Sequence, residues 1–496
     1  MFYWKNAIVL VGIVVLLYPA AMALARSNWE RMMTQKMMVS AGLIACLTVS
    51  AVPILVTPIL FAIMMLLCID QRAPASAPFL MFVVWTPMAA GLLELAGLYL
   101  MPLTPTLVFG ATLAVAFALY PRIKLRPGVV ATDIYLAIFL VVFWICVSLR
   151  DGITIAMRNF FIYAVPYGLA YWGVSRTRIE RPELALRWLV IGSAMAGAVC
   201  LFETLRSWPL YSGLYAIKRA GNIIQYNDMM LLRAGVMRSS GPFVHPLVGS
   251  VVFGMAGVAA AGLVALRGMR WPILLLGAAI VIGMLVTVSR SGLVALVVGV
   301  IALMALRGRP LTALSAMILG LGGFFLLQFI SGSDGSSTAA YRLYILGGIP
   351  ATLGSKLILG YREAIGLGLL DAFMQGQGLV DLVNIYLAIA VVGGLVSLLP
   401  YIAFLLSSFT QYRALRRTGP AREQLIAGQT LVAMQISYMV AAMFVGAWST
   451  PMLLSILCAA LLVALRVEAE QAPKRAAIAA QKAARDQDPY LLPAIR

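Results

Sequence analysis

Long apolar runs, separated by short polar stretches, follow one another along almost the whole sequence. A helix that crosses a lipid bilayer needs about 20 mostly apolar residues, and these runs have about that length. They are continuously apolar, whereas the strands of a membrane β-barrel alternate apolar and polar residues over about ten positions. The pattern therefore predicts an all-α, polytopic integral membrane protein with about fourteen transmembrane helices. The runs lie near residues 6–25, 38–69, 78–100, 103–120, 131–149, 154–173, 188–205, 245–266, 272–289, 292–306, 311–330, 382–408, 426–447 and 451–466.

The run at 38–69 is too long for one upright helix, and it contains Pro53 and Pro58. Proline breaks or kinks a helix, and a long apolar stretch can also tilt in the bilayer. This run predicts either two short helices or one bent helix, so the count is open by one. The side of the membrane on which the N-terminus lies is open as well.

Composition supports the membrane assignment, because 62% of the 496 residues are hydrophobic and only 11% are charged. A formal net charge of +19 could indicate nucleic-acid binding. The basic residues, however, cluster in alternate short loops between the runs, as the positive-inside rule requires of cytoplasmic loops. This placement predicts a cytoplasmic C-terminus and no nucleic-acid partner. The clusters are Arg122, Lys124 and Arg126; Arg176, Arg178, Arg181 and Arg187; Arg267 and Arg270; Arg307 and Arg309; and Arg413, Arg416, Arg417 and Arg422.

Two connections on the face opposite the basic clusters are long, and loops of such length usually carry function. We therefore expect a transmembrane helical domain at 1–466, with outer (periplasmic) loops at about 206–244 and 331–380. Residues 467–496 are rich in alanine with mixed charges and predict a cytoplasmic tail.

The signatures of soluble enzymes are absent from the sequence, which has no P-loop, HExxH or GxSxG motif. A single histidine cannot build a multi-histidine metal site, and the five cysteines lie within apolar runs without CxxC spacing. We therefore expect no metal site, no disulfide and no cofactor. The candidate residues are polar groups at the outer ends of the runs.

The first candidate group is the stretch from Arg238 to Pro246, which ends the first outer loop and includes His245. Its simplest interpretation is a proline-broken helix start with an arginine that reaches the membrane surface. The functional interpretation is an anion site beside a titratable imidazole. Glu203, at the end of a nearby run, is expected to form hydrogen bonds between helices.

The second candidate is Arg290, in a short outer hairpin at 287–292 where the positive-inside rule disfavours a basic residue. An arginine there needs an anionic partner, and a phosphate fits the planar guanidinium group. A structural ion pair with Asp or Glu explains the motif equally well.

The third candidate group belongs to the second outer loop and contains Arg342, Asp381 and Asn384. Asp381 and Asn384 are three residues apart, so on a helix they would share a face. Asp381 has two compatible interpretations, a helix N-cap and a catalytic carboxylate.

Together these motifs resemble the O-antigen polymerase and O-antigen ligase superfamily of bacterial cell-envelope glycosyltransferases. The matching features are Arg-x-x-Gly-x-Phe-x-His-Pro at 238–246, Ser-Arg-x-Gly at 289–292, and a late outer loop followed by Asn-x-Tyr-Leu at 384–387 and the pair Gly393-Gly394. Each motif is short, and their order along the second half of the chain matches better than any single one.

The resemblance implies transfer of a glycan from a polyprenyl pyrophosphate to a sugar hydroxyl at the periplasmic face of the bacterial inner membrane, without metal or nucleotide sugar. It implies that Arg238, Arg290 and Arg342 bind the pyrophosphate, where the leaving group develops charge. The implied partners are a polyprenyl-pyrophosphate-linked oligosaccharide donor and acceptor, membrane lipid, and other polysaccharide export proteins.

One departure concerns the general base, since ligases of this superfamily carry histidine directly before the asparagine and this chain has Val383. Asp381 is therefore expected as the base, with His245 as second choice and Asn384 as a further catalytic residue. The departure favours a polysaccharide polymerase over an O-antigen ligase, whose acceptor is lipid A-core. An alternative of another class is a flippase or transporter of lipid-linked oligosaccharide, which would place charged residues along the middle of many helices.

Overall fold

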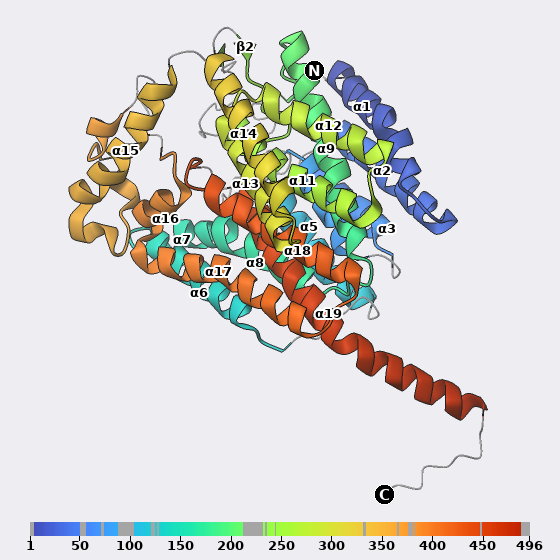
Figure 1. The fold of residues 1–496 in the computed structure, drawn as a ribbon. Helices are drawn as coiled ribbons and strands as arrows, with labels where there is room; N and C mark the ends of the chain where they lie inside the picture. The colour runs from blue at the N-terminus through green and yellow to red at the C-terminus, as the bar shows by residue number, and fades with distance from the viewer. Residues whose placement is uncertain are drawn as a thin grey trace, which may run out of the picture.

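The fold is a bundle of helices packed side by side (Figure 1). The exception is a short hairpin in which strand β1 (Leu232–Arg233) pairs antiparallel with β2 (Val236–Met237). The computed structural model thus confirms the all-α fold class. It describes residues 4–49, 56–70, 74–87, 104–120, 125, 128–211, 232–233, 236–243, 245–330, 334–364, 367–374, 380, 382–446 and 449–487.

The helices of the first half of the chain are α1 (Trp4–Ala23), α2 (Asn28–Val49), α3 (Val56–Cys68), α4 (Ser76–Trp85), α5 (Pro105–Leu119), α6 (Ala131–Ser148), α7 (Ile153–Asn159), the π-helix η3 (Phe160–Ala164), α8 (Val165–Ser175) and α9 (Pro182–Arg206). Those of the second half are α11 (Pro246–Arg267), α12 (Trp271–Val286), α13 (Arg290–Leu306), α14 (Pro310–Ile330), α15 (Asp334–Leu353), the 3-10 helices η4 (Gly354–Leu357), η5 (Arg362–Ala364) and η6 (Asp371–Phe373), α16 (Ile385–Gly393), α17 (Leu395–Arg417), α18 (Arg422–Ala441) and α19 (Thr450–Gln487).

Seven helices in the described part of the chain are long and apolar enough to cross a membrane, namely α1, α2, α6, α9, α11, α17 and α19. The shorter apolar helices α3, α4, α5, α12, α13 and α14 accompany them. Large apolar side chains are exposed on the bundle surface, among them Leu16 at 71% and Ile59 at 60%. Such a surface suits lipid tails rather than water, so the chain is a multi-pass membrane protein.

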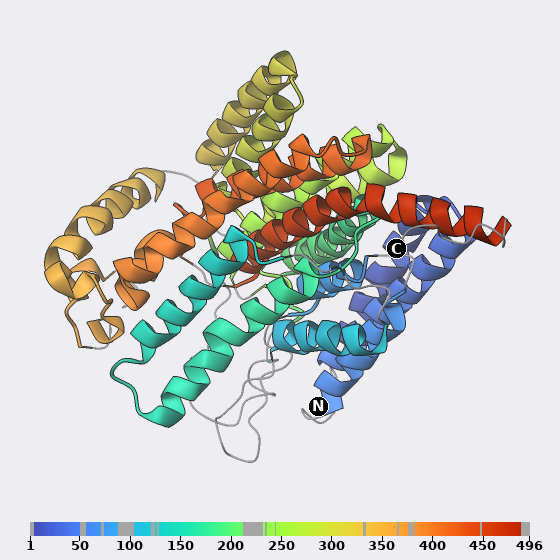
Figure 2. The same ribbon diagram turned by 90° about the horizontal axis from the view of Figure 1, so that it is seen from below.

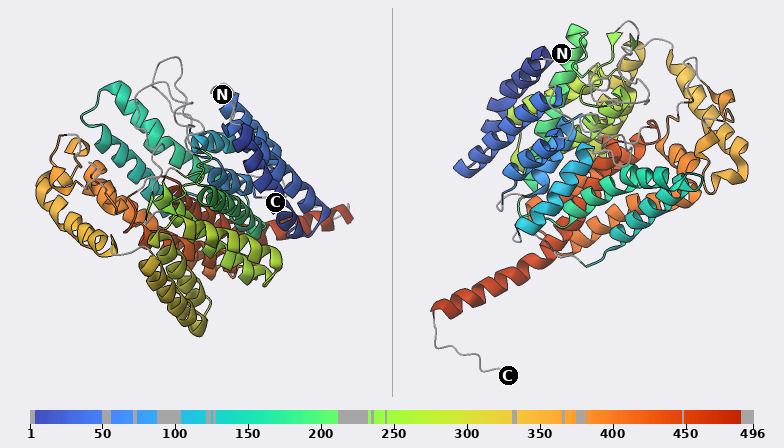
Figure 3. Two further views of the ribbon diagram at one scale, coloured as in Figure 1. Left: turned by 90° about the horizontal axis from the view of Figure 1, so that it is seen from above. Right: turned by 180° about the vertical axis from the view of Figure 1, so that it is seen from behind.

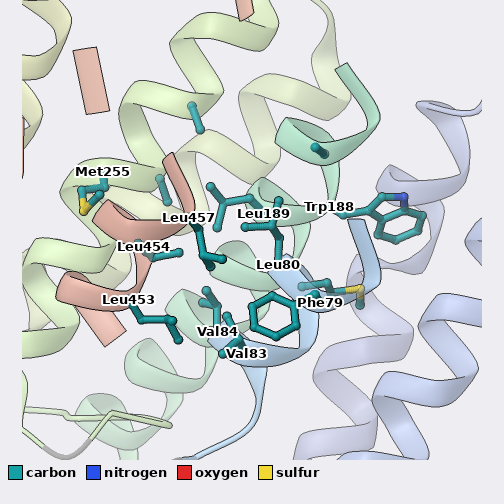
Figure 4. Packing of buried hydrophobic residues seen from close by; sticks show 14 of the residues in the cluster. Phe79, Leu80, Val83, Val84, Trp188, Leu189, Met255, Leu453, Leu454 and Leu457 are labelled. Atoms are coloured by element: carbon teal, nitrogen blue, oxygen red, sulfur yellow. The ribbon is translucent and has the colours of Figure 1, made fainter. Parts of the chain in front are cut away.

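The core is centred on the apolar segments of α9 and α19, which are almost entirely buried. Leu80 of α4 lies beside Leu189 of α9 in the same hydrophobic cluster as Leu453 of α19 (Figure 4). Close approach of α9 and α12 depends on glycine, because a Cβ atom on Gly197 would lie 2.3 Å from the Ala279 carbonyl oxygen. Small residues at helix crossings are typical of membrane bundles, where van der Waals packing drives association.

Buried ion pairs hold one end of the bundle, which we call the ion-pair end. Arg187 pairs with Glu30 at 2.9 Å, and Arg267 pairs with Glu183 at 2.7 Å. Both arginines also donate to the Leu24 carbonyl, which ties α1 and α2 to α9 and α11. The positive-inside rule alone explained both arginines in the sequence, but each is 7% exposed or less and has a structural partner.

The opposite end, which we call the loop end, carries the β1–β2 hairpin and the first turn of α1. Asn6 there donates to the Leu210 carbonyl at 2.6 Å, whereas Leu24 lies at the ion-pair end. The N-terminus lies near β2, and α19 extends away from the opposite end (Figures 1 and 3). The described ends of the chain therefore lie on opposite sides of the bundle.

Three regions differ from the expected spans or refine them. The run at 38–69 comprises two helices, α2 and α3, which is one of the two alternatives that the sequence left open. The run at 382–408 is divided into α16 and α17, and the loop predicted at 331–380 contains the helix α15. Figure 2 shows α15 at the edge of the bundle, beside α16 and away from α1 and α2.

The break between α16 and α17 occurs at Gly394, which has a φ of 81°. Here the backbone bonds to the second outer loop instead of continuing the helix: Tyr361 N–H donates to Val391 O at 2.7 Å, and Val396 N–H donates to Ile358 O at 3.2 Å. Because these bonds satisfy the groups freed at the break, the interruption is stable inside a membrane domain.

Two crossed ion pairs fix the same loop to the turn after α6. Arg150 pairs with Glu363 at 3.1 Å, and Arg362 pairs with Asp151 at 3.3 Å. The guanidinium of Arg150 also lies 4.4 Å from the ring centroid of Tyr361. The loop that follows α15 is thus held against the bundle at two places.

Candidate functional site

Glu203 organises the first candidate group. Its carboxylate, on a residue 2% exposed, accepts hydrogen bonds from the Ser239 hydroxyl, from Gly241 N–H at 3.0 Å and from Leu210 N–H at 2.9 Å. Gly241 has a φ of 52°, and a Cβ atom there would lie 2.7 Å from Cys200 Sγ. Glu203 of α9 therefore fixes the positions of Ser239 and Gly241, which follow Arg238. The sequence predicts that Glu203 bonds between helices, whereas its carboxylate bonds to residues near both ends of the first outer loop.

His245 is the N-cap of α11, and Pro246 takes the first helical position. Its Nδ1 accepts a hydrogen bond from Leu247 N–H at 3.1 Å. Burial and the positive charge of Arg238 lower the pKa of His245 to about 4. The imidazole is therefore neutral near pH 7, and with Nδ1 occupied as an acceptor its proton is on Nε2.

The guanidinium of Arg238 reaches the second candidate group. Its Nε donates to the carbonyl oxygen of Thr287 at 3.0 Å. Thr287 opens the hairpin that ends at Arg290, the first residue of α13. The structure thus brings the first two candidate segments, which are far apart in sequence, into direct contact.

The two serines of the hairpin motif Ser-Arg-x-Gly belong to a cluster of serine hydroxyls. Ser250 of α11 lies 3.1 Å from both Ser289 and Ser291, which are 2.8 Å from each other. A Cβ atom on Gly292 would lie 2.4 Å from the Ser250 carbonyl oxygen, so α11 and α13 cross here in close contact. Three residues of Ser-Arg-x-Gly therefore serve helix packing, and Arg290 is not a member of this hydroxyl cluster.

Val288, in the same hairpin, has a φ of 49°. A β-branched residue in the left-handed region is strained, and such strain occurs where the surroundings enforce a conformation. Arg290 follows two residues later at the N-terminus of α13, where unpaired backbone N–H groups favour negative charge. The hairpin geometry therefore suits an anion.

The third candidate group meets the turn that follows α18. Arg342 of α15 donates to the Phe444 carbonyl at 3.5 Å, and its guanidinium lies 5.5 Å from the Phe444 ring centroid. In the same turn Ala442 O accepts from Ile385 N–H at 2.9 Å, at the start of α16. The turn at 442–446 thus connects α15, α16 and α18.

Arg290 lies at the same end of the bundle as this turn. Ser437 of α18 donates to the Ala295 carbonyl of α13 at 2.7 Å, and Gly299 packs near both Ser437 and Ala433. The two helices are therefore antiparallel, so the start of α13 faces the end of α18. Arg290 precedes Ala295 by about 7 Å along the helix axis. All three arginines accordingly belong to the loop end, opposite the buried ion pairs.

Asn384 has the helix N-cap role that the sequence offered for Asp381, three residues earlier. It is the N-cap of α16, and its Oδ1 accepts from Tyr386 N–H at 2.9 Å and Leu387 N–H at 3.1 Å. The helix begins only at Ile385, and the prediction that Asp381 and Asn384 share a helical face stays untested. Asp381 lies outside the described residues.

The other residues of the third motif also pack locally. The Tyr386 hydroxyl donates to the Met439 carbonyl at 2.9 Å, which joins α16 to α18. A Cβ atom on Gly393 would lie 2.2 Å from the Phe143 ring. Asn-x-Tyr-Leu and Gly-Gly are thus explained by helix capping and close contact.

Within the described residues, no group of three or more His, Cys, Asp or Glu side chains is close enough to hold a metal ion. The arrangement at the loop end is therefore one of guanidinium groups, a neutral imidazole and hydroxyls. Guanidinium, imidazole and hydroxyl groups are hydrogen-bond donors that can bind an anion.

Comparison of the chain with models of protein families gives no match, and comparison with curated proteins gives none either.

Proposed function

We propose that the chain is a polysaccharide polymerase, a membrane glycosyltransferase that moves a glycan from a polyprenyl pyrophosphate to a sugar hydroxyl of another lipid-linked repeat unit. The observation that carries the proposal is the 3.0 Å hydrogen bond from Arg238 to the Thr287 carbonyl, because it joins the first outer loop to the hairpin that bears Arg290. Guanidinium groups beside a helix N-terminus have the charge and geometry that a pyrophosphate requires. Arg342, held at the turn after α18, contributes from the second loop.

In the proposed reaction the oxygen of the acceptor hydroxyl attacks the anomeric carbon of the donor sugar. The bond between this carbon and the pyrophosphate oxygen breaks, and the pyrophosphate leaves with the electron pair. The arginines stabilise the charge that develops on the leaving group.

The hydroxyl proton must pass to a base, for which we propose Asp381. His245 receives a different role, because a group whose pKa is about 4 is a weak base near pH 7. Its neutral Nε2–H instead donates a hydrogen bond to the substrate. Asn384 supports the site as the N-cap of α16, three residues after Asp381 in the sequence.

For the topology we propose an inner-membrane protein with a periplasmic loop end and a cytoplasmic ion-pair end, following the positive-inside rule. Because the described ends of the chain lie on opposite sides of the bundle, we propose an odd number of crossings, which differs by one from the expected fourteen. The tail after residue 466, which continues α19 as a helix, is then cytoplasmic.

Two alternatives predict different products. An O-antigen ligase would transfer the glycan to lipid A-core. A flippase needs polar groups through the bundle, but the buried charged residues of the described transmembrane helices lie near helix ends, as Glu203 and Arg267 do.

The test is complementation of a deletion strain, with analysis of glycan length at the cell surface. A polymerase deletion should still display single repeat units, whereas a flippase deletion should display none. Arg290→Lys keeps the charge but loses the bidentate fork, so we expect polymer yield to fall at least about tenfold, as removal of a charge-assisted hydrogen bond of about 1.5–3 kcal/mol predicts.

The matched control is Arg309→Lys, at an exposed position near the other end of α13, which should leave polymer yield unchanged. Full-length polymer from Arg290→Lys would contradict the pyrophosphate role. Loss of all surface glycan in the deletion strain would favour the flippase.

A further inference from the structure

A cavity of ≈ 180 Å³, partly open to the surface, lies between three helix ends of the bundle. It is lined by Thr104, Thr106, Ile162, Tyr163, Pro166, Tyr167, Ser449 and Leu453. The lining comes from the start of α5, from η3 and α8, and from the start of α19. On this measure one water needs about 10–15 Å³, so the space admits a ligand of several heavy atoms. It is smaller than the about 300–1,000 Å³ of drug-sized sites.

Ser449 provides an independent sign that the cavity takes a polar ligand. The residue is 6% exposed, and among the described residues its hydroxyl has no hydrogen-bond partner. Leaving a hydroxyl unpaired inside a protein costs about 1–3 kcal/mol. A ligand hydroxyl in the cavity would remove this cost.

The lining also defines the chemical class of the ligand. Five of its side chains carry a hydroxyl, which both donates and accepts hydrogen bonds, and none of the lining residues is charged. An anion such as pyrophosphate is excluded, since it would lose its hydration without a compensating cation. Aromatic and aliphatic faces from Tyr167, Pro166 and Leu453 supply the remaining wall (Figure 4 shows Leu453 within the core). Alternating hydroxyls and apolar faces match a sugar ring.

The cavity adjoins the candidate site on two sides. Ser449 lies five residues after Phe444 in the sequence, and the ring of Phe444 contacts the guanidinium of Arg342. Tyr163 lies close enough to Arg362 and Asp151 to feel their charges, so this wall lies beneath the crossed ion pairs of the second loop. A ligand in the cavity would therefore lie near the loop after α15, and Ser449 connects its wall in sequence to the turn that contacts Arg342.

We propose that this cavity binds one neutral sugar ring of the glycan, with Ser449 as a hydrogen-bonding residue. In its biological meaning the inference rests on the proposed glycosyltransferase function, but binding itself does not depend on turnover. The site would fix the glycan while the arginines hold its pyrophosphate. A charged sugar such as a uronic acid would be rejected.

The experiment uses the full chain in lipid nanodiscs without donor substrate. Saturation-transfer difference NMR measures binding of the methyl glycosides of glucose, galactose, mannose and N-acetylglucosamine, with methyl glucuronide as the charged comparison. We expect at least one neutral glycoside to bind with a millimolar Kd and the glucuronide not to bind. Ser449→Ala should weaken binding at least fivefold, and Ser449→Leu, which fills the space, should abolish it.

Ser193→Ala is the matched control, because Ser193 is likewise fully buried with an unpaired hydroxyl among the described residues but does not line the cavity. The inference is overturned if no neutral glycoside binds, if Ser449→Ala and Ser449→Leu bind like the wild type, or if the glucuronide binds equally well. Ser449→Ala conserves the fold and keeps the test decisive should Ser449→Leu not fold. Sugar binding together with normal polymer yield from Arg290→Lys would instead count against the proposed function alone.

Discussion

At His245, two effects act on the imidazole in the same direction. Burial removes the water that would solvate an imidazolium, and Arg238 adds a positive charge nearby. Its Nδ1 is held by Leu247 N–H, so the ring cannot turn without loss of the α11 cap. The result is a neutral donor of fixed orientation beside the arginines, which a sequence motif alone does not reveal.

The chain has a single histidine, so its titration can be observed directly. In protein carrying ¹³C,¹⁵N-histidine we expect one imidazole signal, the Nε2–H tautomer and a pKa of about 4. Arg238→Gln should raise this pKa, because it removes a positive charge. A wild-type value near the ordinary 6.5 would contradict the buried, arginine-flanked position.

The lowered pKa of His245 makes the stability of the folded protein depend on pH. The unfolded chain takes up the proton below about pH 6.5, and the folded chain does so only near pH 4, so protons favour unfolding in this window. The contribution of His245 is therefore lost as the pH falls from about 6.5 to 4. His245→Asn keeps a capping oxygen and should show a smaller fall in Tm across that range than the wild type.

Residues of the site differ in how well sequence could predict them. Arg238, Arg290 and Arg342 are apparent because each is a basic residue on the side where topology disfavours one. Glu203 was recognised as an unusual carboxylate, but its bonds to Ser239 and Gly241 depend on a loop that folds back over α9. Phe444 gave no signal, since an aromatic residue near a helix end is common in membrane proteins.

At the scale of elements, apolar runs predicted helices well and predicted interruptions poorly. The sequence of α16 and α17 looks like one continuous span. The break cannot be seen in it, because the hydrogen bonds that stabilise the break come from residues 358–361, far away in sequence. Likewise the sequence predicts a loop where α15 forms, because this segment is less apolar than a membrane span and its length alone cannot distinguish helix from coil. The local sequence pattern predicts neither the break nor the helix α15, since tertiary contacts determine both.

The close approach of Gly394 and the second loop can be tested with a matched glycine. A Cβ atom on Gly394 would lie 2.4 Å from the Ile358 carbonyl oxygen, and φ is 81°. Gly268 has a similar φ of 78° but nothing within 4 Å. Gly268→Ala should therefore cost only backbone strain, about 1–2 kcal/mol, while Gly394→Ala should cost more and displace the loop.

The measurement is thermal unfolding in detergent together with limited trypsin digestion. In Gly394→Ala we expect faster cleavage after Lys356 and Arg362, which flank the docked segment. Gly268→Ala should digest like the wild type in this region. Equal Tm values and equal cleavage for the two variants would show that the contact at Gly394 does not hold the loop.

At the scale of the whole molecule, charge is divided between two ends with different chemistry. The ion-pair end satisfies its arginines internally, with Arg267 bonded to both oxygens of Glu183 and to the Leu24 carbonyl. The loop end gathers arginines on backbone carbonyls and an aromatic ring. We therefore expect substitutions at the first end to change stability, and substitutions at the second to change activity.

Glu183→Gln tests this division, because it leaves Arg267 charged at a side chain only 1% exposed. Breaking one side of a buried ion pair costs about 3–5 kcal/mol, since the remaining charge is uncompensated. We expect a lower Tm for the purified protein and, where the chain folds, an unchanged ratio of polymer to protein.

Replacing both partners, as Glu183→Gln with Arg267→Gln, should cost less stability than Glu183→Gln alone, although the Leu24 carbonyl then loses one of its two arginine donors. The control is Glu180→Gln, whose partner Arg178 lies in a more exposed pair that is worth about 0–1 kcal/mol. A Tm for Glu183→Gln equal to that of Glu180→Gln would mean that the ion-pair end does not hold the bundle, and a lower specific polymer yield at normal Tm would mean that the two ends are not functionally separate.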